Sequence, residues 1–246
     1  MNRRGFLAAA ALGLAPGWTH AIEPLDALRF SSLRPGAPLP ADYRPYAFSA
    51  QSRHTEYSLV ADEEGRTVLR ARADASTAGI IRDLRVDLDT HPVLAWRWKA
   101  ARLPQKGDLR AKAGDDFAAR LYVVFDLRLA ALPFGERFGV TMARLIYGDD
   151  VPAAALCYVW ATRAAVGTVA PNAYTGRVRM VVVDSGPANL GRWVAHERDV
   201  AADYRLAFGE APPAVKGVVV STDTDNTGES AEAWYGDAAF RARPSP

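Results

Sequence analysis

The sequence predicts an all-β protein: an antiparallel β-sandwich of jelly-roll type with one or two short helices in its connections. Two observations support this fold class. Segments rich in β-branched and aromatic residues, none longer than about a dozen residues, recur between turn-forming residues, and helical periodicity is confined to two places. The eight predicted strands are residues 55–61, 67–73, 92–100, 117–127, 154–161, 177–184, 215–222 and 231–240.

The first 21 residues have the layout of a twin-arginine signal peptide. Arg3 and Arg4 precede Phe6 and an Ala/Leu-rich run, and the alanine at position 21 suits cleavage after it. We therefore expect export in folded form to the periplasm and a single mature domain over residues 22–246. The apolar run is interrupted by glycine and proline and is too short to cross a bilayer, so we expect no membrane span after cleavage.

Turn and helix signals divide the mature domain further. Residues 22–50 hold five prolines and are typical of an extended lead-in. The acid- and glycine-rich residues 62–66 indicate a hairpin loop between the first two predicted strands. The two helical patterns cover residues 135–147 and 199–208. In the second pattern Asp199 can serve as the N-cap and Gly209 can end the helix.

The balance of charges excludes two classes of partner. The chain has 30 basic and 28 acidic residues, and the signal peptide contains two arginines and no acid, so 28 of each remain in the mature domain. With zero formal charge and no dense basic stretch, we expect no affinity for nucleic acid or for anionic membrane surfaces. Cys157 is the single cysteine and lies in an apolar predicted strand, which indicates a buried thiol and no intramolecular disulfide.

Alternation of apolar and polar residues predicts a polar face on two strands. In the third predicted strand Arg97 and Lys99 alternate with apolar residues. In the fourth, the odd-numbered positions from 117 to 125 are apolar, whereas Asp116, Arg120 and Tyr122 fall on the other side. If these two strands are neighbours, the five side chains share one face that could hydrogen-bond a ligand. The alternative is a solvated face on which Asp116 and Arg120 form ion pairs that contribute little to stability.

An aromatic residue and an acidic loop add two further candidates. Trp234 on the last predicted strand could stack against a sugar ring, although tryptophans also fill the cores of sandwiches. Residues 222–230 are rich in oxygen donors, and Asp223, Asp225 and Glu229 are candidate ligands for calcium. Where a helix-loop-helix calcium site needs its bidentate glutamate, this chain has Trp234. A hairpin turn with self-hydrogen-bonding side chains explains the same composition without a metal.

No other cofactor is evident from the sequence. The chain contains no dinucleotide-binding glycine pattern, no phosphate-binding Gly-Lys-Ser/Thr loop and no Gly-x-Ser-x-Gly motif. Its few histidines are far apart and lack metal-ligand spacing, so zinc chemistry and Ser-His-Asp catalysis are both poorly supported.

Four motifs stand out along the mature domain. They are WRWK at 96–99, KAGDDFAAR at 112–120, TDTDNTGES at 222–230 and WYGD at 234–237. In these motifs the chain resembles a bacterial family of exported proteins whose function is unknown. The resemblance implies a β-sandwich and a periplasmic location, and it brings no established activity and no catalytic residues.

The compartment and the polar face together favour a protein that binds a cell-envelope glycan or another polar small ligand. The first alternative is a hydrolase or lyase that acts on envelope polysaccharide. It would use Asp115, Asp116 and Asp223 or Asp225 as acid and base, with Arg120 stabilising developing charge. The second alternative is an envelope assembly or interaction protein whose polar face docks a partner chain.

Overall fold

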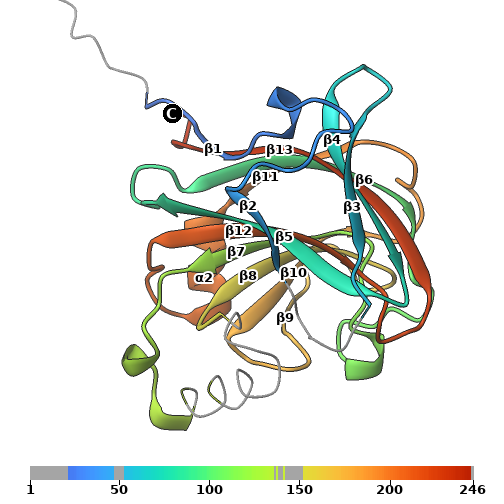
Figure 1. Ribbon diagram of the computed structural model, residues 1–246. Coiled ribbons are helices and arrows are strands. Elements are labelled where there is room, and N and C mark those ends of the chain that lie inside the picture. The colour runs from blue at the N-terminus through green and yellow to red at the C-terminus, as the bar shows by residue number, and fades with distance from the viewer. Residues whose placement is uncertain (1–21, 47–52, 136, 138–140, 142–151, 245–246) are drawn as a thin grey trace, which may run out of the picture.

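Two β-sheets pack face to face in the computed structural model, which describes residues 22–46, 53–135, 137, 141 and 152–244 (Figure 1). This arrangement confirms the predicted all-β sandwich. The predicted signal peptide and most of the predicted helix at 135–147 lie outside the described residues. None of the helices in the described part of the chain is long and apolar enough to span a membrane.

The first sheet contains six of the described strands. Five of them follow the order β11-β6-β13-β4-β3. The sixth, β1, lies outside this order and pairs with β13. Their bounds are β1 Leu25–Leu28, β3 Glu56–Ala61, β4 Thr67–Asp74, β6 Val93–Arg102, β11 Val194–Asp199 and β13 Ser230–Arg241. The residues between β3 and β4 form the predicted hairpin loop, in which Asp62 accepts hydrogen bonds from the backbone N–H of Glu64 and Arg66.

The second sheet contains seven described strands in the order β2-β5-β12-β7-β8-β10-β9. All of its pairs are antiparallel except β8 with β10, which run parallel. Its strands are β2 Tyr43–Tyr46, β5 Thr77–Val86, β7 Arg120–Phe125, β8 Ala155–Ala161, β9 Val169–Pro171, β10 Val178–Ser185 and β12 Val215–Asp223. The predicted strand at 117–127 is therefore shorter than expected.

The main core lies between the two sheets. Leu121, Val123 and Phe125 of β7 are buried there together with Trp96 and Trp98 of β6. A second apolar cluster lies on the opposite face of the seven-stranded sheet, and it contains Phe117, Tyr122 and Cys157. Burial raises the pKa of the Cys157 thiol, as expected for an unreactive core cysteine.

Pairing between strands corrects one expectation about the polar face. β6 pairs with β11 and β13, whereas β7 pairs with β8 and β12. The expectation that Arg97 and Lys99 share a face with Asp116, Arg120 and Tyr122 is therefore wrong. Alternation correctly places Leu121, Val123 and Phe125 in the main core, but Phe117 lies in the second cluster with Tyr122, because residue 117 precedes β7. Alternation also contains no information about which strands become neighbours.

Helix α2, Val200–Phe208, confirms the second helical prediction. The Asp199 side chain accepts a hydrogen bond of 2.8 Å from the backbone N–H of Ala202, as an N-cap does. Gly209 ends the helix with φ +73°, in the left-handed region that favours glycine. The described residues also contain three short 3₁₀ helices: η1 Phe30–Ser32, η2 Lys112–Gly114 and η3 Leu129–Ala131.

Candidate functional site

A strip of cations and tryptophans crosses the outer face of the six-stranded sheet. Arg70, Trp234 and Lys99 are direct cross-strand neighbours on β4, β13 and β6. Lys99 Nζ lies 4.6 Å from the Trp234 ring centre and 5.4 Å from that of Trp193, close enough for attraction to both rings. Arg97 Cζ lies 4.1 Å from the Trp193 ring centre. We call these five side chains the cation–tryptophan strip.

Three residues of the strip were among the predicted site residues: Arg97, Lys99 and Trp234. Two were missed. Trp193 directly precedes β11, a polar edge strand whose pattern of short and charged side chains did not predict a strand. Arg70 could have been found from alternation, because it lies between buried Leu69 and Ala71 in a strand that was predicted.

The tip of the β3–β4 hairpin contacts the strip through two carboxylates. Asp62 accepts a hydrogen bond of 2.9 Å from Arg97 Nη2. Glu63 forms an ion pair with Lys99 Nζ and accepts a hydrogen bond of 3.2 Å from Trp193 Nε1. The hydrogen bond from Lys99 is the main reason why the pKa of Glu63 is lowered to about 2, and Trp193 contributes in the same direction. Glu63 is therefore ionised at any physiological pH.

The WYGD motif has a structural explanation at this strip. Gly236 leaves space for Arg97, because a Cβ at position 236 would lie 2.6 Å from Arg97 Cγ and 2.7 Å from Arg97 Nε. Tyr235 points to the other side, where its buried hydroxyl donates to the carbonyl oxygen of Ser221 at 2.6 Å. The motif therefore supports Arg97 on the outer face and joins the two sheets on the inner face.

A hollow of about 470 Å³ lies beside the strip on the same sheet. Four charged side chains of alternating sign line it in one cross-strand row: Glu56, Arg72, Glu232 and Arg102. Glu232 also forms an ion pair of 2.5 Å with Arg70 of the strip, so the hollow and the strip are continuous. Charged and hydroxyl groups dominate this lining, which suits a polar ligand better than an apolar one.

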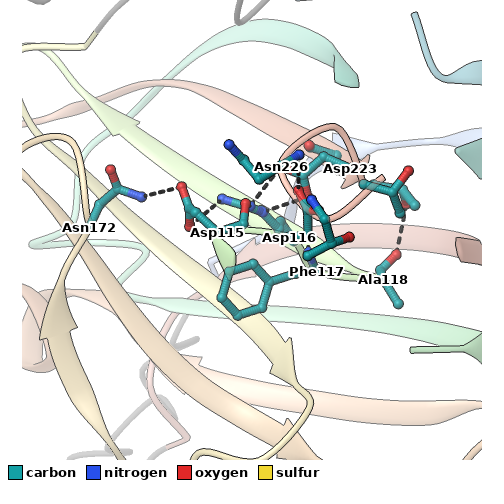
Figure 2. Close-up of polar contacts among 12 residues, drawn as sticks. Asp115, Asp116, Phe117, Ala118, Asn172, Asp223 and Asn226 are labelled. Atoms are coloured by element: carbon teal, nitrogen blue, oxygen red, sulfur yellow. Dashed lines mark hydrogen bonds and ion pairs between the residues drawn. The ribbon is translucent and has the colours of Figure 1, made fainter. Parts of the chain in front are cut away.

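A second group of predicted site residues forms a buried network around Arg120 (Figure 2). Arg120 is 2% exposed. Its Nε donates to Asp223 Oδ1 at 2.9 Å, its Nη2 lies 2.6 Å from Asp223 Oδ2, and its Nη1 donates to the Tyr122 hydroxyl at 3.1 Å. Asp115 lies 3.4 Å from Nη1 and accepts a hydrogen bond from Asn172 at 3.0 Å. This network occupies the outer side of the seven-stranded sheet.

Asp116 joins the 112–120 motif to the loop at 222–230. Its two carboxylate oxygens accept the backbone N–H groups of Asn226, at 3.2 Å, and Thr227, at 2.6 Å (Figure 2). The backbone of Phe117 exchanges hydrogen bonds with Asp223: the Phe117 N–H donates to Oδ1 at 3.1 Å, and the Asp223 N–H donates to the Phe117 carbonyl at 3.3 Å. The two longest motifs of the chain therefore hold each other in place.

Two carboxyl groups of the network have raised pKa values. Burial raises the pKa of Asp223 well above its ordinary value; Arg120 opposes this shift, and the neighbouring Asp116 and Asp115 add to it. Burial also raises the pKa of Asp115, with Arg120 and Asn172 acting in the opposite direction. Asp115, Asp116 and Asp223 are all at least nine-tenths buried. Ligand contact by Asp116, Arg120 and Tyr122 stays a prediction, although all three side chains are buried in this structure.

The predicted calcium ligands are only partly brought together. Carboxylate oxygens of Asp116, Asp223 and Asp225 lie within 4.8 Å of one another, and we call these residues the acidic cluster. Glu229 is not part of it, because its carboxylate instead accepts the backbone N–H of Lys106 at 2.9 Å. Of the predicted calcium ligands, Asp223 and Asp225 therefore belong to the acidic cluster, and Asp116 rather than Glu229 is its third member. Oxygen donors of this kind suit calcium, and its binding here stays a prediction.

Comparison with known proteins gives only a weak structural similarity. None of the curated proteins matches this chain. The solved structures that match include the xyloglucanase domain of NopAA, a type three effector from Sinorhizobium fredii, in complex with cellobiose. It is 8% identical to this chain and covers 85% of this chain and 96% of that domain, with a TM-score of 0.43. Similarity at this level supports no conclusion about the activity of this chain.

Family membership is clearer. A family model described as a protein of unknown function, DUF3047, matches residues 41–239. The match includes every described strand except β1 and the end of β13, together with the cation–tryptophan strip and the buried network. It confirms the predicted membership of a family of unknown function, and we conclude that this chain belongs to the DUF3047 family.

Proposed function

We propose that this protein binds a glycan of the cell envelope in the periplasm, and that the cation–tryptophan strip is its binding surface. The observation on which the proposal depends is the position of Lys99 between two half-buried tryptophans on a rigid sheet. The apolar face of a sugar ring can pack against an indole, while ammonium and guanidinium groups donate hydrogen bonds to its hydroxyls.

The support from the sheet is as important as the identity of the residues. Arg70, Trp234 and Lys99 stand on three hydrogen-bonded strands. Groups on strands are held more precisely than groups on loops, so less entropy is lost when a ligand binds. The adjoining hollow extends the surface with carboxylates and guanidinium groups that can hydrogen-bond further sugar units.

Binding is better supported than the hydrolase or lyase alternative. That alternative uses Asp115, Asp116 and Asp223, and a raised pKa at Asp115 and Asp223 is what a general acid requires. However, these carboxyl groups are between 0% and 6% exposed, and they already accept hydrogen bonds from side chains or from the backbone. A polysaccharide cannot touch these buried carboxyl groups in the structure.

A glycan array followed by calorimetry on the purified full chain tests the proposal. We expect Trp234→Ala and Lys99→Ala to lower the affinity for any bound glycan at least tenfold. Arg85→Ala is a matched control, since Arg85 is an exposed cation on the other sheet that pairs with Asp126 at 3.2 Å. If the wild-type chain binds no glycan, or if Trp234→Ala binds as well as wild type, the strip is not a glycan-binding surface.

A further inference from the structure

The carboxylate of Glu63 occupies the position that a ligand carboxylate would take on the strip. One of its oxygens pairs with the Lys99 ammonium, and the other accepts the Trp193 Nε1–H at 3.2 Å. An ammonium and an indole N–H that converge on one carboxylate form a typical anion-recognition pair. Here the chain itself supplies the anion, from the tip of a hairpin.

Each cation of the strip is neutralised by one carboxylate, but the three carboxylates differ in accessibility. The Asp62 side chain that pairs with Arg97 is 1% exposed, and the Glu232 side chain that pairs with Arg70 is 28% exposed. The Glu63 side chain is 65% exposed. The Lys99 side chain itself is 9% exposed, so this pair is open to solvent on the carboxylate side. Glu63 is therefore the carboxylate that a ligand can reach and replace most readily.

Asp62 shows why such displacement does not require the hairpin to unfold. It accepts hydrogen bonds from the backbone N–H groups of Glu64 and Arg66 as well as from Arg97, at 2.8–3.0 Å. These bonds hold the base of the turn in place. The Glu63 side chain can rotate away from Lys99 and Trp193 while the backbone of the turn stays where it is.

We infer that the strip selects acidic sugars, and that a carboxylate on the ligand replaces Glu63 on Lys99 and Trp193. This inference rests on the proposed function and specifies its ligand class. Two envelope sources supply a carboxylate on a pyranose ring: a uronic acid and the lactyl ether of an amino sugar. In the unliganded protein Glu63 is an internal competitor, which lowers the affinity for acidic ligands and has little effect on neutral ones.

Matched pairs of ligands test the inference by calorimetry on the full chain. The first pair is oligogalacturonate and a neutral galacto-oligosaccharide of the same length, and the second is N-acetylmuramic acid and N-acetylglucosamine. We expect the acidic member of at least one pair to bind more tightly, and the pair that responds identifies the source. Removing the competing charge of Glu63 in Glu63→Gln should raise the affinity for the acidic member about two- to fivefold. Glu64→Gln is the matched control, because Glu64 pairs with Arg66 and not with the strip.

A second measurement follows the displacement directly. In a ¹H–¹⁵N spectrum, the indole N–H of Trp193 should shift on addition of the acidic sugar, and Lys99→Met should abolish the preference for acids. Equal affinity for acidic and neutral sugars, or no gain in Glu63→Gln, overturns the inference and leaves glycan binding intact. If no sugar of either kind binds the wild-type chain, the proposed function fails as well.

Discussion

Replacing Arg120 by methionine removes the central cation of the buried network and keeps most of its volume. In the variant the carboxylate of Asp223 loses partners at 2.6 and 2.9 Å, and the Tyr122 hydroxyl loses a donor at 3.1 Å. Removing one partner of a buried ion pair typically costs about 3–5 kcal/mol, because the other charge is left uncompensated. For a protein of this size that corresponds to a fall in Tm of about 6–20 °C.

Thermal and urea unfolding at neutral pH, followed by circular dichroism and tryptophan fluorescence, measure this loss. Arg85→Met is the control, because the exposed pair between Arg85 and Asp126 should contribute no more than about 1 kcal/mol. The double variant Arg120→Met/Asp223→Asn should lose less stability than the sum of the two single variants, since the remaining charge is removed as well. If Arg120→Met is as stable as the Arg85→Met control, the network does not hold the two motifs together.

Two other predictions concern the hairpin tip and the acidic cluster. The folded-state pKa of Glu63 lies below its unfolded value, so the contact with Lys99 stabilises the protein above that unfolded value and is lost as pH falls through about 2. A carboxyl NMR titration should show a midpoint near 2, which rises in Lys99→Met towards the ordinary value of about 4.3; a wild-type midpoint above 4 would contradict the contact. For the acidic cluster, calcium titrated into the full chain should release or absorb heat and raise Tm, and Asp225→Asn should abolish both effects. No heat and an unchanged Tm would exclude a calcium site there.

Patterns of a few residues were sufficient to predict most elements of the fold. Period-two alternation predicted eight strands, and turn residues predicted the loop at 62–66. Helical periodicity and capping residues predicted the helix that Gly209 ends. The strands that were missed are short, lie at a sheet edge or carry several charges. Val194–Asp199, for example, alternates charged and small side chains. Its strand conformation depends on pairing with Val93–Arg102 rather than on its own propensity.

Only part of the candidate site could be predicted from the sequence, because contacts between distant segments decide which residues meet there. Alternation placed Arg97 and Lys99 opposite the core, and it placed Arg120 and Tyr122 away from their apolar neighbours. It could not show that these two pairs belong to different sheets, because strand pairing joins residues far apart in the sequence. It also could not show that loops bury Arg120, since burial depends on segments more than 100 residues away, such as Asp223.

The sequence by itself therefore determined the fold class, most strand positions and which residues of the predicted strands face the main core, with exceptions such as Phe117, since these follow from neighbouring residues. Only the tertiary structure decided which polar residues lie together. It gathered Trp193, Arg97, Lys99, Trp234 and Arg70 on the outer face of one sheet and enclosed Arg120 among carboxylates on the other. The physical reason is that backbone pairing and loop packing are long-range, whereas alternation is local.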